Sequence, residues 1–266
     1  MNPLKQSFTW WSFAKRGVED GALLDGAAKI GFAGVELIDE ALWPRAREAG
    51  LRIAATNGHG TIKDGLNRRE NAARILGELR ENIARAAAWN IPVLICFSGN
   101  RAWKNADGTA GGISDADGLA AAADTLAAAA PEAAKAGVTL AVELLNSRVD
   151  HEGCQCDRTA WGVALCARVN SPAVRLLYDI YHMQIMEGDV IRTIRREHRW
   201  FAHYHAAGNP GRGPIADETQ ELNYAAILRA VRGTGFGGFV GHEFIPGPDP
   251  LGDLARAFAL ATAATA

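Results

Sequence analysis

Eight short apolar runs alternate with longer stretches of helical character along this chain. The candidate strands are residues 6–11, 34–38, 52–56, 92–97, 138–144, 174–179, 201–205 and 238–243. Each run is almost continuously apolar, which is typical of strands that are covered on both faces. Strands that alternate with helices in this way favour βαβ units and a parallel sheet.

The stretches between these runs carry helical periodicity and end signals. Helices are expected at residues 21–30, 40–49, 69–89 and the alanine-rich 115–136. Asp157 and Asp189 are predicted to cap helices that run to residues 169 and 198, and Asn223 one that ends near Gly233. Asp249 followed by Pro250 predicts the start of the last helix.

Eight such units over 266 residues predict one α/β domain, residues 1–266, folded as a single (β/α)8 TIM barrel. A doubly wound open sheet is the main competitor. No G-x-G-x-x-G follows the first strand, which weakens that alternative.

The composition of the chain limits which classes of binding partner can be expected. With 48% hydrophobic and 22% charged residues and a net charge of −2, the chain is an ordinary globular sequence without a basic field. We therefore expect no nucleic-acid and no membrane partner, and a soluble, cytoplasmic protein without a signal peptide or membrane span. Its four cysteines form no pair of C-x-x-C motifs, so reduced thiols are expected. A soft-metal site at Cys154 and Cys156 is the weaker alternative.

Four of the predicted strands carry a carboxylate or an imidazole at or beside their last residue: Glu143, Asp179, His205 and Glu243. In a barrel, the carboxyl ends of the strands meet at one face, where the loops 98–114, 146–157 and 206–223 would surround them. Three carboxylates and one imidazole can bind Mg²⁺ or Mn²⁺ and leave positions for substrate oxygens. The alternatives are a structural salt bridge for Glu143 and a helix cap for Asp179.

Further side chains can reach the same face. His182 follows Asp179 by three residues, and Arg212 lies in a glycine- and proline-rich loop, where it could contact a carbonyl, carboxylate or phosphate or simply be solvated. His203 shares one side of its strand with His205 and could instead be a core histidine. Weaker candidates for the pocket are Glu36, His59 and His151.

Glu143 and Glu243 belong to strands that lie across the barrel from each other. A substrate between them could lose a carbon-bound proton to one carboxylate and regain it at the neighbouring carbon or on the other face. A metal ion would polarise the carbonyl and stabilise the enediolate.

Several segments resemble the xylose isomerase-like superfamily of TIM barrels, and within it the hydroxypyruvate isomerase group. They are residues 143–151, 178–189, 209–212, 221–224 and 241–244. The resemblance implies that Glu143 and Glu243 bind the metal and exchange protons, that Asp179 is a ligand, and that His182 and Arg212 contact the substrate. His59 is predicted as a further substrate contact. His205 departs from the glutamine usual in hydroxypyruvate isomerases and is similar to the histidine of ketose 3-epimerases.

The predicted activity is therefore the divalent-metal-dependent isomerisation of a small α-hydroxy carbonyl compound, similar to that of hydroxypyruvate isomerase. One Mg²⁺ or Mn²⁺ is expected, with Co²⁺ or Zn²⁺ as alternatives. A ketose 3-epimerase of free sugars is the second reading, and a metal-dependent endonuclease of the same superfamily is disfavoured because no basic groove is indicated. The exact substrate, its phosphorylation and assembly into a homo-oligomer are left open.

Overall fold

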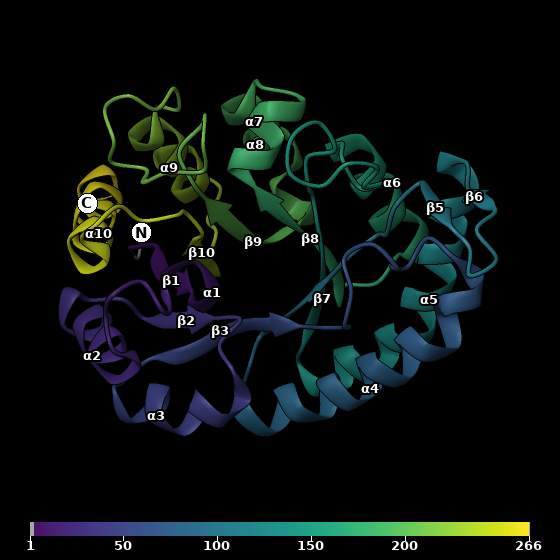
Figure 1. Ribbon diagram of the computed structural model, residues 1–266, viewed down its shortest axis with the longest axis horizontal. Helices are drawn as coiled ribbons and strands as arrows, with labels where there is room; N and C mark the ends of the chain where they lie inside the picture. The colour runs from purple at the N-terminus through teal and green to yellow at the C-terminus, as the bar shows by residue number, and fades with distance from the viewer. Residues whose placement is uncertain (1–2, 266) are drawn as a thin grey trace. The chain divides into compact units, whose positions relative to one another are not determined.

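Eight parallel strands form the core of the computed structural model, which describes residues 3–265 (Figure 1). They close into a barrel in the order β1-β10-β9-β8-β7-β4-β3-β2. The predicted (β/α)8 fold is confirmed. The bounds of the barrel strands are β1 (Lys5–Thr9), β2 (Gly34–Glu36), β3 (Arg52–Asn57), β4 (Val93–Cys96), β7 (Thr139–Glu143), β8 (Val174–Asp179), β9 (Phe201–Ala206) and β10 (Phe239–His242).

The first and last barrel strands are direct neighbours. β1 pairs in parallel with β10 through Phe8 and His242 and with β2 through Thr9 and Glu36. Nearly every residue of these strands is buried. The near-continuous apolar runs in the sequence therefore correspond to strands covered on both faces.

The main helices follow the strands as expected. They are α2 (Asp20–Ile30), α3 (Trp43–Glu48), α4 (Ala72–Trp89), α5 (Asp115–Ala136), α6 (Thr159–Val169), α8 (Val190–Glu197), α9 (Tyr224–Gly233) and α10 (Pro250–Ala264). Asn223 caps α9 by accepting from the Ala226 N–H at 3.1 Å, and Asp249 caps α10 through the Gly252 N–H at 3.0 Å. Both caps were predicted. No helix in the described part of the chain has the length and apolar character needed to cross a membrane.

The predicted cap at Asp157 is wrong. Its carboxylate instead accepts hydrogen bonds from Arg101 at 2.9 and 3.2 Å and from the Ser147 hydroxyl at 2.6 Å. α6 begins at Thr159, whose N–H and hydroxyl donate to Glu187 at 3.0 and 2.6 Å. Asp189 does precede α8, but its side chain makes no capping hydrogen bond.

Several short elements were not predicted. α1 (Trp10–Phe13) follows β1, and α7 (Ile180–Met186) begins directly after β8. The loop after β4 contains a hairpin of β5 (Ala102–Lys104) and β6 (Ala110–Gly112). Three 3-10 turns occupy Glu40–Leu42, Arg69–Asn71 and His198–Trp200.

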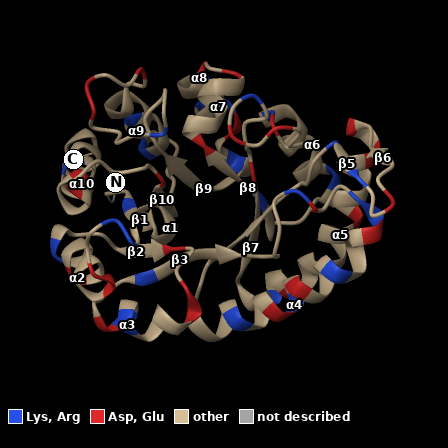
Figure 2. Cartoon of the chain, in the orientation of Figure 1, with Lys and Arg blue, Asp and Glu red and all other residues tan. Residues whose placement is uncertain are grey.

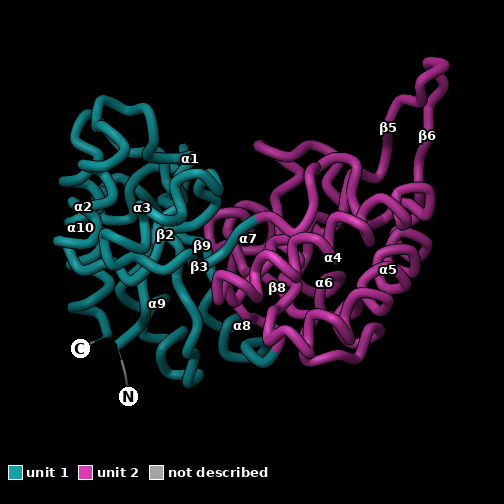
Figure 3. The backbone as a smooth tube through the Cα atoms, turned by 90° about the horizontal axis from the view of Figure 1, so that it is seen from below, with its two compact units in different colours: residues 1–56, 189–199, 203–266 teal, residues 57–188, 200–202 magenta. Residues whose placement is uncertain are grey.

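The described contacts divide the chain into two compact units, coloured separately in Figure 3. Unit 1 comprises residues 1–56, 189–199 and 203–266, and unit 2 comprises residues 57–188 and 200–202. Unit 1 contains β1, β2 and β10 with most of β3 and β9, and unit 2 contains β4, β7 and β8. That the chain forms one domain over residues 1–266 stays a prediction.

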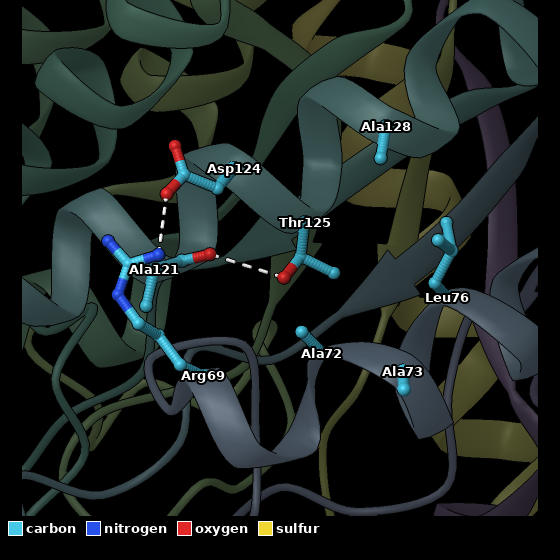
Figure 4. A pocket seen from close by; sticks show the side chains of 8 residues that line it. All are labelled: Arg69, Ala72, Ala73, Leu76, Ala121, Asp124, Thr125 and Ala128. Atoms are coloured by element: carbon cyan, nitrogen blue, oxygen red, sulfur yellow. Dashed lines mark hydrogen bonds and ion pairs between the residues drawn. The ribbon is translucent and has the colours of Figure 1, made fainter.

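In unit 2, α4 and α5 pack together, and acidic and basic residues are interspersed along α4 (Figure 2). Arg80 of α4 forms an ion pair with Glu132 of α5 at 2.8 Å, and Arg69, in the 3-10 turn before α4, forms one with Asp124 of α5, also at 2.8 Å. A groove of about 270 Å³ lies between them, lined by Arg69, Ala72, Ala73, Leu76, Ala121, Asp124, Thr125 and Ala128 (Figure 4). None of the predicted site residues lines it.

All four cysteines are free thiols with no exposed surface, and all four belong to unit 2. Burial raises the pKa of Cys96 and of Cys166 to about 12 and that of Cys154 to about 11, and it raises the pKa of Cys156 well above its usual value. Because the reactive form of cysteine is the thiolate, buried thiols with raised pKa values are expected to stay reduced and unreactive.

Candidate active site

Two of the four predicted metal ligands meet in unit 1. β9 and β10 are parallel neighbours, with His205 opposite Gly241, and Glu243 directly follows β10. Glu243 is 4% exposed and His205 is fully buried. The His205 Nδ1 lies 3.0 Å from the Glu243 Oε2. The imidazole and the carboxylate are thus placed to share one cation.

The Glu243 carboxylate has two further partners. The Trp11 indole donates to Oε1 at 3.0 Å, and the Arg212 guanidinium pairs with Oε2 at 2.6 Å. The guanidinium also lies 5.2 Å from the centre of the Trp11 ring, within the range of a cation–π contact. Arg212 is therefore beside a predicted catalytic carboxylate, and its contact with substrate stays a prediction.

The loop after β9 holds Arg212 in place through its backbone. Arg212 adopts a φ of 54°, an uncommon conformation for a residue with a side chain, and its carbonyl accepts from the Ile245 N–H at 2.7 Å. The Gly208 N–H donates to the Gly213 carbonyl at 2.7 Å across the same loop. These bonds tie the loop to the segment that follows Glu243.

Glu36, a weaker candidate from the sequence, is the centre of a buried cluster in unit 1. Its carboxylate accepts a hydrogen bond from Ser7 and lies 2.8 Å from the His203 Nε2 and 3.1 Å from the His205 Nε2. Burial alone would raise the pKa of Glu36, but the two imidazoles outweigh it and hold that pKa well below its ordinary value. Glu36, His203 and His205 also qualify as a buried group able to hold a metal ion.

His203 is fully buried, as expected for the core alternative, and its Nε2 contacts Glu36, whereas its Nδ1 has no hydrogen-bond partner within the described residues. Its neighbour along the barrel wall, His242, is equally buried and contacts Gln6 Oε1 through Nε2 at 2.9 Å. Burial lowers the pKa of His242 to about 4.

The other two predicted ligands lie in unit 2. Glu143 ends β7 and Asp179 ends β8, its parallel neighbour, with exposed fractions of 5% and 1%. Asp179 also caps α7, because its Oδ1 accepts from the His182 N–H at 2.8 Å. The helix-cap alternative for Asp179 is therefore present, and its Oδ2 lies 3.7 Å from the His182 Nε2.

The surroundings of His182 define its tautomer. Asn146 Oδ1 accepts from the Val149 and Asp150 N–H groups, both at 2.9 Å, which fixes the orientation of the amide. Its Nδ2 therefore donates to the His182 Nδ1 at 2.6 Å and to Asp150 at 2.6 Å. Because Nδ1 accepts, the neutral ring carries its proton on Nε2, the atom on the side of Asp179. His182 can present an N–H donor there.

His59 and His151 occupy different places in unit 2. The His151 ring packs edge-on against His182 at 5.2 Å. His59 is 1% exposed, and its Nε2 accepts from the Phe97 N–H at 2.9 Å. Burial lowers the pKa of His59 to about 4, so the ring is neutral near pH 7. Its predicted substrate contact stays a prediction.

The neutral state of His59 gives a testable dependence of stability on pH. Its pKa is about 4 in the folded protein against 6.5 for the free side chain, so the unfolded chain binds the extra proton between these values. Folded-state stability is then lost as the pH falls through this window. We expect His59→Gln, which can still accept from Phe97, to reduce the drop in unfolding free energy between pH 7 and 4.5 by roughly 2 to 3 kcal/mol.

Denaturant unfolding at both pH values would measure this. His198→Gln, at an exposed histidine, is the matched control and should keep the drop of the unchanged protein. Equal drops in the unchanged protein and the His59 variant would contradict the assignment.

The donor groups fit a hard divalent cation. Both units contain buried acidic side chains at strand ends, and His205 adds one imidazole to this mostly oxygen set. Burying carboxylates in such apolar surroundings is costly unless positive charge or hydrogen bonds compensate. Within unit 1, Glu36, His203 and His205 form one such group, and a joint ligand set of Glu143, Asp179, His205 and Glu243 stays a prediction.

Comparison with protein families gives one matching model, the xylose isomerase-like TIM barrel, over residues 24–260. A 2-oxo-tetronate isomerase from Cupriavidus necator is 35% identical over 123 residues, which cover 46% of this chain and 46% of that protein. The match thus spans less than half of that relative. A putative hydroxypyruvate isomerase from Homo sapiens is 29% identical over 245 residues, 88% of this chain and 86% of the relative.

Solved structures share the fold. An AP endonuclease of family 2 from Brucella melitensis superimposes with a TM-score of 0.78 at 24% identity, covering 95% of this chain and 97% of that one. An L-ribulose 3-epimerase gives 0.77 at 21% identity, with 96% and 92% covered. At these identities the likeness shows the fold alone. The names of the curated relatives support the expectation of an isomerase.

Proposed function

Because the chain belongs to the xylose isomerase-like TIM barrel family, we propose that it is a divalent-metal-dependent isomerase of a small α-hydroxy carbonyl compound. Hydroxypyruvate and 2-oxo-tetronates, which appear in the names of its relatives, define the substrate class. The observation that carries the proposal is the contact of His205 with Glu243, a buried imidazole and carboxylate at the ends of neighbouring strands.

Glu143, Asp179, His205 and Glu243 would together hold the cation. The support is their burial and their position, since each lies at or next to the carboxyl end of a strand of one closed parallel barrel. When bound, the cation would polarise the carbonyl of the substrate and so acidify the neighbouring C–H bond.

The two glutamates would move the proton. One carboxylate takes the proton from the hydroxyl-bearing carbon, and the electron pair of that C–H bond moves toward the carbonyl to give an enediolate of the substrate. A hydroxyl proton passes between the two substrate oxygens, and a proton returns to the former carbonyl carbon. The carbonyl and hydroxyl groups have then exchanged places, with no net gain or loss of electrons.

His182 and Arg212 would orient the substrate. The N–H that His182 carries on Nε2 is a donor for a substrate oxygen, and Asn146 keeps it in that tautomer. The Arg212 guanidinium, held against Glu243 and Trp11, suits a carbonyl or carboxylate oxygen. Both roles rest on their proximity to the proposed ligands.

A ketose 3-epimerase is the second candidate. It is favoured by the histidine, His205, at the proposed ligand position on β9. Epimerisation uses the same enediolate and differs in returning the proton to the carbon that lost it, on the opposite face. The choice between the two activities depends on the substrate rather than on the ligands.

Proton exchange with solvent separates these activities. The Mn²⁺-loaded protein is incubated in D₂O with hydroxypyruvate and, separately, with free ketoses, and deuterium is located by NMR. Deuterium at the carbon next to the carbonyl of hydroxypyruvate, with formation of the isomeric aldehyde, supports the isomerase. Deuterium only at carbon 3 of a ketose supports the epimerase, and label in no substrate refutes both.

A further inference from the structure

Glu36 has no part in the proposed proton transfers, yet it is a fully buried carboxylate held by three donors. A carboxylate in the interior is costly to desolvate, and a buried apolar residue of similar size is often neutral or stabilising in its place. Its retention next to His205 therefore calls for a role beyond packing.

The two ring nitrogens of His205 face different carboxylates. Nε2 lies 3.1 Å from Glu36 Oε2, and Nδ1 lies 3.0 Å from Glu243 Oε2. An ionised carboxylate only accepts hydrogen bonds, so the nitrogen facing Glu36 carries hydrogen. A cation bound beside Glu243 would displace any hydrogen on Nδ1, and a ring that keeps its hydrogen on Nε2 then offers its Nδ1 lone pair to that cation.

We propose that Glu36 is a positioning residue, which fixes His205 in the Nε2–H tautomer and directs its Nδ1 lone pair toward a cation shared with Glu243. This inference rests on the proposed function. Hydrogen bonding of the second ring nitrogen to a carboxylate is a common way to orient a ligating histidine and to raise its basicity.

The packing around Glu36 supports a defined position. A Cβ on Gly241 of β10 would lie 2.9 Å from the His205 Cδ2 and would overlap the Glu36 carboxylate oxygen. Glycine at this position is what lets the carboxylate and the imidazole lie against β10. Ser7 on β1 and His203 on β9 hold the carboxylate from two other strands.

Ser7→Ala is a matched control for Glu36→Gln. Both residues are fully buried, and Ser7 donates to Oε1, whereas His205 contacts Oε2. A purely structural carboxylate would make the two variants alike: both would unfold at lower temperature, with no difference in metal binding. If Glu36 instead positions His205, metal binding is weakened in Glu36→Gln and not in Ser7→Ala.

The experiment titrates Mn²⁺ into the unchanged protein and both variants by calorimetry, and assigns the His205 tautomer by ¹⁵N NMR in the Mg²⁺-loaded proteins. We expect Glu36→Gln to bind Mn²⁺ about tenfold more weakly or worse, and Ser7→Ala to stay within about threefold of the unchanged protein. The hydrogen of His205 should be on Nε2 in the unchanged protein and partly on Nδ1 in Glu36→Gln.

Equal Mn²⁺ affinities in all three proteins, or equal losses in both variants, would overturn the positioning role. A proton on Nδ1 of His205 in the unchanged protein with Mg²⁺ bound would overturn it as well, even if Glu36→Gln does not fold. No Mn²⁺ binding by the unchanged protein would instead refute the proposed function, and the cation-directed role of Glu36 with it.

Discussion

Glu243→Gln is expected to lower kcat by roughly 10³-fold while the barrel stays folded. The amide cannot accept the substrate proton, and it is a weaker cation ligand than the carboxylate. It also places an NH₂ group where Oε1 now accepts from Trp11 or where Oε2 pairs with Arg212. Glu143→Gln should give a loss of the same order, because the two-glutamate scheme uses both carboxylates.

Initial rates on the substrate identified by deuterium exchange, together with thermal unfolding, would measure this effect. Asp253→Asn is the matched control: Asp253 is a buried carboxylate of unit 1, 6% exposed, that accepts from the Gly247 N–H and pairs with Arg256. It should lose stability and keep its activity. Substantial turnover in either glutamine variant would contradict the two-glutamate scheme.

Gly65→Ala is expected to destabilise the protein by about 3 kcal/mol or more. The loop after β3 runs against the end of β4, with the Leu66 N–H bonded to the Phe97 carbonyl at 3.1 Å. A Cβ on Gly65 would lie 2.3 to 2.5 Å from backbone atoms of Gly99, Phe97 and Ser98. Backbone atoms cannot move aside as a flexible side chain can, so the loop must separate from β4.

Gly77→Ala in the same unit provides the contrast. Gly77 lies inside α4, and a Cβ there would meet nothing within 4 Å. Alanine is favoured over glycine in a helix by about 1 kcal/mol, so this variant should be slightly stabilised. Urea unfolding of both variants would test the pair, and a Gly65→Ala protein as stable as Gly77→Ala would show that the loop is not packed as described.

Local patterns in the sequence were sufficient to predict the barrel. Apolar runs and end signals such as Asn223 and Asp249 act within a few residues, and these elements appear with bounds close to those expected. The predicted cap at Asp157 was wrong because contacts between residues far apart in the sequence decide the hydrogen bonds there. Its carboxylate is taken by Arg101, and the start of α6 is satisfied by Glu187, which lies 28 residues further along the chain.

The same distinction applies to the candidate site. The prediction of four ligands, Glu143, Asp179, His205 and Glu243, used only their position at or next to the end of an apolar strand, where a charged or polar group has an evident cost. Glu36 ends a strand in the same way, but its partners are 29, 167 and 169 residues away in the sequence. Only the folded barrel brings Ser7, His203 and His205 to that carboxylate. The importance of Glu36 therefore could not be judged from the sequence alone.

The placement of the four thiols has an experimental use. Since all of them are buried in unit 2, a thiol reagent can modify Cys96, Cys154, Cys156 or Cys166 only when that unit opens. The rate of thiol modification therefore reports transient opening of unit 2. The rate of amide hydrogen exchange in β1 and β10 reports transient opening of unit 1. Matching opening free energies from the two probes would mean that the chain unfolds as one cooperative body, and different values would mean that each unit opens independently.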